Sequence, residues 1–344
     1  MNSRERIEAV FAQKMPDRVP IFPKISFANV IACDDIGVTD YLYNAEKMAE
    51  ATIRAYEKFG WDGIALHTTI AWSGIILGSE FNYPKDNVPL RVAPLIDEID
   101  GEETLEKIVI RDPYEVPITR TVIDAVALVR KELGPDAYIM SWVDGPLNIC
   151  SQICNLDDLL MSLIEDPDTC HAMFKKVLEQ STLYAKALVD AGADMIGHGH
   201  ATASSSVISR KAYEEFALPR EKELIAYIHS LGAKGLTHIC GNITNIVDLI
   251  TTNGADVVDF DSMNDPLVLM ERASNYTVFR GNIAPAFLGE ATPEAIEEEV
   301  RKLMERTVGH PNLFLSSGCE VNLNVPVENL AAMVNAGKKY GVRM

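Results

Sequence analysis

Three side chains that can bind a metal ion lie in two short segments far apart in the sequence. The segment LTHICG (236–241) carries His238 and Cys240 two residues apart, and LSSGCE (315–320) carries Cys319. Each cysteine follows an apolar run typical of a strand, and residues two apart on a strand point to the same side. Two cysteines and one histidine are an established zinc ligand set, and three protein ligands leave one position open. Spacing alone leaves two interpretations, a zinc site or three unrelated buried residues.

The charge of this ligand set bears on its chemistry. Two thiolates and a neutral imidazole balance Zn²⁺, so the centre would be nearly neutral. Such a centre accepts an anionic fourth ligand, such as a thiolate or an alkoxide. It lowers the pKa of a bound thiol or stabilises a leaving oxygen anion. Both effects suit the transfer of a methyl group.

The elements that would position these residues alternate regularly between helix and strand. Amphipathic stretches end at a glycine or a similar turn residue, and a short apolar run follows. About seven or eight such strands favour a closed (β/α)8 TIM barrel, in a single domain over residues 1–344. Strands are expected at residues 61–67, 137–146, 193–200, 233–241, 255–261, 276–282 and 312–319. Helices are expected at residues 45–60, 118–133, 167–191, 210–231, 243–253, 293–308 and 326–339.

Two segments fall outside this repeat. The N-terminal segment MNSRERIEAVFAQK is charged and helical in pattern, and it predicts an N-terminal extension of the barrel. A stretch near residues 68–116 is rich in Pro, Asp and Glu, and it predicts an insertion over the barrel mouth with a short hairpin. The N-terminal segment lacks the apolar core of a signal peptide, so we expect a cytoplasmic protein.

Charge and composition argue against several classes of function. The formal net charge is −19, which argues against a nucleic-acid partner because phosphate binding requires a basic face. No stretch of about 18 consecutive apolar residues occurs, so no membrane span is expected. A disulfide framework among the six cysteines is not expected in a cytosolic chain of this size.

Polar residues gather where the predicted strands end. In a (β/α)8 barrel the C-terminal ends of the strands carry the chemistry. Four of the seven histidines fall at such ends, although the strands themselves are apolar. For any single residue a hydrogen-bonded wall position is as good an interpretation as a functional one, so the informative signal is the shared bias towards one rim. These residues are His67, Asp144, His198, His200, His238, Cys240, Asp259, Asp261, Asn282, Cys319 and Glu320.

The metal-binding segments also resemble a known motif. His238-Ile239-Cys240-Gly241 followed by Ser317-Gly318-Cys319 resembles the zinc motif of the cobalamin-dependent methyltransferases of the uroporphyrinogen decarboxylase superfamily. The resemblance spans nearly the whole chain, and the His-x-Cys and distant Cys are its most specific part. Further similar segments lie at residues 4–6, 16–20, 144–146, 191–194 and 326–330.

The resemblance implies a fold, a cofactor and a partner. It implies a barrel that holds one Zn²⁺ ion by His238, Cys240 and Cys319, with zinc acting as a Lewis acid. Members of the family move a methyl group between a small molecule and the cobalt of a corrinoid (cobalamin) carried by a separate protein. One branch methylates a thiol, coenzyme M, and others demethylate O-methyl or N-methyl compounds. The implied partners are therefore a corrinoid protein and a small methylated substrate or thiol.

Two departures from the superfamily narrow this expectation. Uroporphyrinogen decarboxylases carry an arginine-rich N-terminal segment that binds porphyrin carboxylates, whereas IFPKISFANVIA (21–32) has one lysine and no arginine. Decarboxylation of uroporphyrinogen is therefore disfavoured. The chain also lacks a D-x-H-x-x-G corrinoid-binding motif, because Asp194 and His198 have the wrong spacing for one. We therefore expect the corrinoid on another chain.

The segment GHGH (197–200) and the residue after Cys319 indicate which branch of the methyltransferase family the chain resembles. The coenzyme M branch has a glycine after that cysteine and no double histidine, so His198, His200 and Glu320 favour demethylation of a small donor. A methoxylated donor needs an acid on its leaving oxygen, which zinc, His200 or Glu320 would supply. Three alternatives stay open: a coenzyme M-type thiol methyltransferase, a decarboxylase-type lyase, and a non-catalytic barrel that binds a corrinoid protein. The predicted catalytic residues are His200, Glu320 and Asp144, and the predicted substrate-binding residues are His67, His198 and Asn282.

Overall fold

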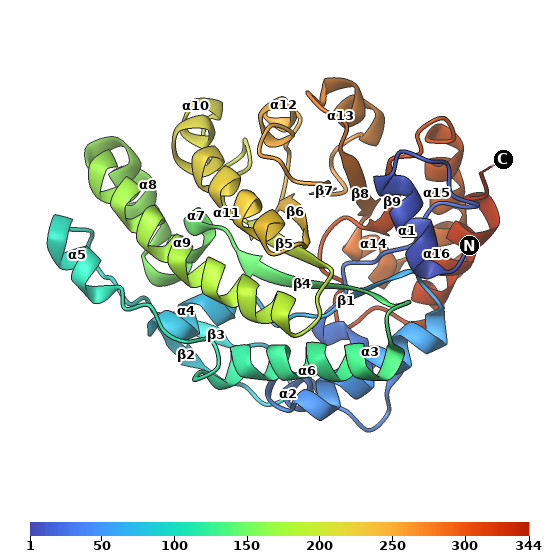
Figure 1. Ribbon diagram of the computed structural model, residues 1–344, viewed down its shortest axis with the longest axis horizontal. Helices are drawn as coiled ribbons and strands as arrows, with labels where there is room; N and C mark the ends of the chain where they lie inside the picture. Colours follow the sequence, from blue (N-terminus) through green and yellow to red (C-terminus); the bar gives the residue numbers. More distant parts are fainter. Residues whose placement is uncertain (344) are drawn as a thin grey trace.

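Seven parallel strands form one curled sheet, as a computed structural model that describes residues 1–343 shows (Figure 1). Neighbouring strands follow the order β1-β4-β5-β6-β7-β8-β9, and every neighbouring pair is parallel. Helices surround this sheet, so the expected TIM-barrel fold is confirmed. The strands are β1 (Gly63–Ala65), β4 (Tyr138–Asp144), β5 (Met195–His200), β6 (Lys234–Ile239), β7 (Val257–Phe260), β8 (Val278–Ile283) and β9 (Leu313–Ser317).

A short N-terminal segment completes the barrel between its two edge strands. Leu315 of β9 donates its backbone N–H to Pro20 O at 2.9 Å, and Phe22 N donates to Leu315 O at 2.8 Å. On the other side, Asp62 N donates to Ile21 O at 2.7 Å, just before β1. Residues 20–22 therefore occupy the position of an eighth strand. This segment pairs with both edges of the seven-stranded sheet and closes the barrel.

The helices lie largely where the sequence predicts them. They are α1 (Ser3–Phe11), η1 (Phe27–Ala32), α2 (Val38–Tyr43), α3 (Ala45–Phe59), α4 (Ala71–Leu77), α5 (Gly101–Lys107), α6 (Pro117–Leu133), α7 (Pro146–Ile153), α8 (Leu156–Glu165), α9 (Pro167–Asp190), α10 (Arg210–Ala212), η2 (Tyr213–Ala217), α11 (Leu218–Ser230), α12 (Val247–Ile250), α13 (Pro266–Arg272), α14 (Pro285–Glu290), α15 (Pro293–Arg306) and α16 (Val327–Tyr340). No helix among these is long and apolar enough to cross a membrane.

Two predicted helices differ from the structure. The helix expected over 210–231 is divided into α10, the π-helical segment η2, and α11. This division coincides with Pro219, which has no N–H to continue the α-helical ladder. The helix expected over 243–253 is only the four-residue α12. Its N-terminal part is a loop because the side chain of Asn264 accepts the backbone N–H of Ile243 at 2.9 Å.

The insertion contains the predicted hairpin. It begins with α4, continues as the antiparallel pair β2 (Glu80–Asn82) and β3 (Leu90–Ala93), and ends with α5. The turn of the hairpin is tied to α2, since Asp86 N donates to the hydroxyl of Thr39 at 2.9 Å. This contact holds the hairpin turn beside the N-terminal segment that follows residues 20–22.

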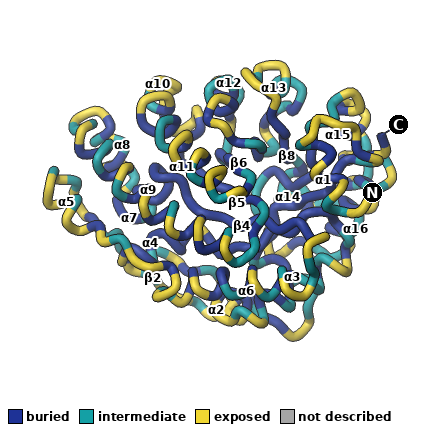
Figure 2. Tube along the Cα trace, in the orientation of Figure 1, coloured by how far each residue is buried: buried dark blue, intermediate teal, exposed yellow. Residues whose placement is uncertain are grey.

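The barrel interior is apolar at its N-terminal end, where α1 covers it. Ile7 and Val10 of α1 are fully buried against side chains that alternate inward along the strands. Figure 2 shows the same division, with buried strands at the centre and exposed residues on the outer faces of the helices. The inward-facing side chains of this cluster include Phe22, Tyr138, Met140, Trp142, Leu236, Val257, Val278 and Phe314.

A buried ion-pair network fixes the closing segment to α1 and β1. Asp62 is 1% exposed, and its carboxylate accepts from Arg6 Nη1 and from Arg18 Nη1, each at 2.6 Å. The same carboxylate accepts the backbone N–H of Ile21 at 2.7 Å. The arginines of the 4–6 and 16–20 segments, which the sequence linked to a family, therefore have a structural role here.

Replacing this aspartate tests that role. We expect Asp62→Ala to lower the free energy of unfolding by about 3–5 kcal/mol, because Arg18 loses its carboxylate partner and Arg6 keeps only the carboxylate of Asp17. Denaturant unfolding monitored by circular dichroism would measure the change. The half-exposed Asp17, which also pairs with Arg6, provides the control, and Asp17→Ala should cost about 1 kcal/mol. Equal losses in both variants would contradict the structural role of Asp62.

Candidate metal centre and its cavity

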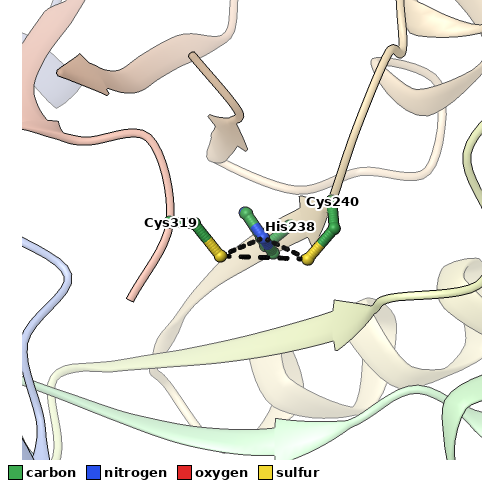
Figure 3. Close-up of side chains that lie close together, drawn as sticks. All are labelled: His238, Cys240 and Cys319. Atoms are coloured by element: carbon green, nitrogen blue, oxygen red, sulfur yellow. Dashed lines mark hydrogen bonds between the residues drawn. The ribbon is translucent and has the colours of Figure 1, made fainter. Parts of the chain in front are cut away.

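His238, Cys240 and Cys319 converge at the mouth of the barrel (Figure 3). His238 Nε2 lies 3.2 Å from Cys240 Sγ and 3.9 Å from Cys319 Sγ, and the two sulfur atoms are 3.9 Å apart. Ligand atoms at zinc-bond lengths around one tetrahedral ion are about 3.5–3.8 Å from each other. These three side chains therefore fit a single zinc ion.

Local backbone features explain why the two distant segments meet. Gly241 has φ +85°, a conformation that L side chains rarely adopt, and its N–H donates to Asp261 at 3.0 Å. Gly318 passes so close to the chain after β7 that an added Cβ would lie 2.5 Å from Ser262 N. This close approach lets the segment after β9 reach the end of β6. The glycines beside Cys240 and Cys319 are thus part of the geometry of the site.

A buried carboxylate supports the histidine ligand from behind. Asp259 Oδ2 lies 3.0 Å from His238 Nδ1. A carboxylate at this position favours the tautomer with a proton on Nδ1, in which Nε2 would present its lone pair to a metal ion. Burial opposes ionisation of Asp259, but Arg280 and Lys24 outweigh it and lower the pKa of Asp259 to about 2. Asp259 therefore stays charged as it orients His238.

Lys24 and Arg280 form a charged layer around Asp259 that the sequence analysis did not assign. Lys24 Nζ lies 3.5 Å from Asp259 Oδ2, and Arg280 Nε lies 3.3 Å from Oδ1. Lys24 Nζ is also 4.4 Å from the centre of the Trp142 ring. The sequence does contain a signal for Lys24. It lies two residues after Phe22, and residues two apart on the closing strand point to the same, inward side.

His238, Cys240 and Cys319, the three candidate ligands, line a cavity of about 320 Å³. Phe27, Trp142 and Val88, the last from the hairpin turn, supply apolar walls. Among the described residues, Lys24 is the only lysine or arginine in the lining. Four of the six residues predicted for catalysis or substrate contact also line it: His67, Asp144, His200 and Glu320.

The other two predicted residues lie elsewhere. His198 is turned towards the surrounding helices, where its Nε2 hydrogen-bonds with the hydroxyl of Thr237 at 2.9 Å. Asn282 lines a separate surface pocket and donates to Asn264 O at 2.8 Å. Gly197 and Gly199 occupy the inward positions of β5. Because neither has a side chain, they leave room for the indole of Trp142. Neither His198 nor Asn282 lies in the lining of the cavity that contains the metal ligands.

Glu320 and His67 face each other across the cavity wall. Glu320 Oε1 accepts from both the backbone N–H and the hydroxyl of Ser26 at 2.7 Å, and its Oε2 lies 3.5 Å from His67 Nε2. His67 Nδ1 is 2.7 Å from the carbonyl of Thr68, so the proton of the neutral ring is on Nδ1. Burial lowers the pKa of His67 to about 3. His67 therefore presents an unprotonated Nε2 towards Glu320.

Asp144 is the third acidic group of the site. It is fully buried, and the hydroxyl of Ser73 donates to its Oδ2 at 2.8 Å. Burial raises the pKa of Asp144 to about 7, against the opposing effect of hydrogen bonds from Ser73 and Asn148. The folded protein therefore binds this proton more tightly than the unfolded chain does.

This shift predicts a change in the pH dependence of stability. The stabilising contribution of protonated Asp144 is complete below about pH 4 and is lost as the pH rises to about 7. Between pH 5 and pH 8, wild-type protein should lose about 3 kcal/mol more unfolding free energy than Asp144→Asn. Urea unfolding at both pH values measures this difference. The exposed variant Asp248→Asn should behave like the wild type, and identical pH profiles for wild type and Asp144→Asn would refute the assignment.

The chain belongs to the family described as Uroporphyrinogen decarboxylase (URO-D), which residues 2–340 match. It is 26% identical over 300 residues to the methylcobamide:CoM methyltransferase MtbA of Methanosarcina mazei, covering 86% of this chain and 85% of that protein. It is 26% identical over 351 residues to the methylcobamide:CoM methyltransferase MtaA of Methanosarcina barkeri, covering 98% of each. The protein is thus an enzyme of this superfamily with methyltransferases among its relatives, as the motif resemblance predicted.

The same fold occurs in a solved methyltransferase from Methanosarcina mazei. That structure superposes with a TM-score of 0.87 at 21% sequence identity and covers 99% of both chains. Nearly the whole chain therefore has the fold of a known barrel.

Proposed function

We propose that this enzyme is a zinc-dependent methyltransferase that moves a methyl group between a small substrate and the cobalt of a separate corrinoid protein. The observation that carries this proposal is the placement of His238, Cys240 and Cys319, whose ligand atoms lie within 4.8 Å of one another in the lining of one cavity. Three protein ligands leave a fourth position for a substrate. The names of the methylcobamide:CoM methyltransferases similar to this chain support the corrinoid partner.

His238, Cys240 and Cys319 would hold the zinc, with Asp259 orienting the imidazole. Zinc supplies a Lewis acid for the sulfur, oxygen or nitrogen that carries the methyl group. Trp142 and Phe27 would pack against the apolar part of a small substrate and exclude water. The remaining polar groups of the cavity would take up or release the proton that accompanies methyl transfer.

The acidic and imidazole groups of the cavity favour demethylation of a small O-methyl or N-methyl donor. A leaving oxygen or nitrogen requires a proton, and His67, His200, Glu320 and Asp144 all line the cavity beside the metal ligands. A second candidate is methylation of a thiol, as in coenzyme M methyltransferases. The names of the relatives favour it, since they act on methylcobamide and CoM.

The lining disfavours decarboxylation of a porphyrin. A substrate with several carboxylates needs several cations, and Lys24 is the single lysine or arginine among the described lining residues. Lys24 is already within 3.5 Å of Asp259. A porphyrin tetracarboxylate or larger polyanion would therefore lack partners in this cavity.

A spectroscopic assay tests the proposed function. Zinc-loaded enzyme would be mixed with cob(I)alamin and a panel of methoxy-aromatic and methylamine compounds, and separately with methylcob(III)alamin and a panel of thiols. Absorbance distinguishes cobalt(I) from methyl-cobalt(III), so the panel that reacts identifies the direction. We expect transfer with at least one compound and none with Cys319→Ala. No transfer in either panel, or equal transfer by the variant, would refute the proposal.

A further inference from the structure

A buried polar network lies behind the cavity, between β5, β6 and α11. Its centre is Glu221, which is fully buried. Tyr213 donates its hydroxyl to Glu221 Oε2 at 2.7 Å, and Asn253 Nδ2 donates to the same oxygen at 2.8 Å. Asn253 Nδ2 also lies 2.8 Å from the hydroxyl oxygen of Thr237, which hydrogen-bonds with His198. These contacts hold one oxygen of the carboxyl group in place.

The other oxygen of Glu221 points at a histidine of the cavity. Glu221 Oε1 lies 3.5 Å from His200 Nε2, and neither atom has a hydrogen-bond partner among the described residues. Both side chains are fully buried, yet the imidazole of His200 contributes to the cavity lining. Such a pair connects the cavity to an acid that no substrate can touch directly.

Packing alone does not account for this arrangement. The layer between the barrel and its helices is otherwise apolar, with buried residues such as Ile196, Leu224, Ile225 and Ile239 around it. Burying a carboxyl group with one unpartnered oxygen costs free energy that an apolar side chain would not. Buried titratable pairs of this kind gather at functional sites.

We propose that Glu221 is a positioning and proton-holding residue for His200, and that together they exchange one proton with the substrate in the cavity. This inference rests on the proposed methyl transfer. In demethylation of a methoxy donor, the carbon–oxygen bond breaks and the methyl group joins cobalt(I), whose electron pair forms the new bond. The oxygen keeps the electrons of the broken bond and takes a proton from His200, which Glu221 replaces. In thiol methylation the proton of the thiol follows the opposite route.

The titration behaviour of the pair agrees with this role. Burial raises the pKa of Glu221 to about 7, and burial lowers the pKa of His200 to about 3. Near neutral pH the pair therefore holds a single exchangeable proton on the glutamate side. The other titratable groups facing the pair are Tyr213 on η2 and His198 on β5. Burial raises the pKa of Tyr213 and lowers the pKa of His198, so both side chains are neutral.

The variant Glu221→Gln separates positioning from proton transfer. The amide can still donate to His200 and accept from Tyr213 and Asn253, but it cannot release a proton. We expect unchanged zinc content and KM, and a kcat lower by about 10²–10⁴-fold. The demethylation rate of the wild type should fall as the pH rises through about 7, and this limb should be weaker in Glu221→Gln, in which Asp144 still titrates near this pH. A variant with wild-type kcat and pH profile would overturn the inference. The control Tyr213→Phe keeps the carboxyl group and should keep the limb.

A second measurement does not depend on turnover. Infrared difference spectra between pH 6 and pH 8 should contain the carbonyl bands of protonated carboxylic acids, and the contribution of Glu221 to them should be missing from spectra of Glu221→Gln, which keep that of Asp144. Nitrogen-15 NMR of His200 should show the same neutral tautomer in both proteins. If wild-type enzyme transfers no methyl group, the proposed function fails, while the contribution of Glu221 to these bands still tests the pair. Identical infrared difference spectra for both proteins would overturn the inference whatever the activity.

Discussion

Protein purified without chelator is expected to contain about one zinc per chain, and Cys319→Ala is expected to contain less than about a tenth of that. The reason is geometric. Within this cluster Cys319 comes from the segment after β9, and without it His238 and Cys240 offer two donors from the end of β6. Two protein ligands hold zinc far more weakly than three, because each lost thiolate removes both a bond and a balancing charge. Elemental analysis by mass spectrometry measures the zinc content.

Cys33→Ala is the matched control for this experiment. Cys33 is also a partly exposed free thiol, but it lies outside the metal-binding cluster. It should therefore retain zinc at the wild-type level. Equal zinc content in Cys319→Ala and wild type would show that the metal is bound elsewhere or nonspecifically.

Replacing Asp259 is expected to weaken zinc binding although none of the three ligands is changed. Asp259→Asn should lower zinc affinity by about 10–100-fold, because the carboxylate that orients His238 is lost. The same change should lower the free energy of unfolding by about 3–5 kcal/mol, since Lys24 and Arg280 lose the carboxylate between them. Competition with a chromophoric chelator measures the affinity, and chemical unfolding measures the stability.

The two effects of Asp259→Asn can be told apart because zinc affinity and the free energy of unfolding are measured separately. If the variant unfolds more readily but binds zinc with wild-type affinity, Asp259 has only a structural role and its proposed support of His238 is wrong. The surface variant Asp248→Asn, which loses an exposed pair with Arg210, should change neither quantity measurably.

The convergence of His238, Cys240 and Cys319 was accessible from the sequence because each position depends on a local rule. His238 and Cys240 share a side by the two-residue period of a strand, and Cys319 follows the last predicted strand. The glycine after Cys240 and the glycine before Cys319 are part of the motif. The reason for the second one, the close approach of Gly318 to Ser262, is visible only in the folded structure. A barrel makes these positions neighbours, so identifying the fold was sufficient to bring them together.

The side to which His198 points could not be predicted from the sequence. In the segment MIGHGH the alternate positions are glycines and histidines, and a residue pattern does not show which set faces the interior. The bulky indole of Trp142 on the neighbouring strand decides it, because a Cβ at Gly197 would lie 2.4 Å from its ring. This contact joins residues 55 positions apart, and no local pattern reports it.

The supporting charges and the closing segment were missed for related reasons. Residues 20–22 are too short for a strand pattern, and only hydrogen bonds to both barrel edges identify them. Glu221 occupies an ordinary position in a predicted amphipathic helix, so its contact with His200 appears only when α11 packs on β6, the strand beside β5. Arg280 sits in an apolar strand, where its partner Asp259 is supplied by the strand before it.

We propose that His238, Cys240 and Cys319 form a zinc site with one position open to substrate. X-ray absorption at the zinc edge tests it most directly. For the enzyme alone, the predicted first shell contains two sulfur atoms, one imidazole nitrogen and one additional light atom. Saturation with a small thiol should replace the light atom with a third sulfur. A shell of four protein ligands that the thiol does not alter would contradict the account.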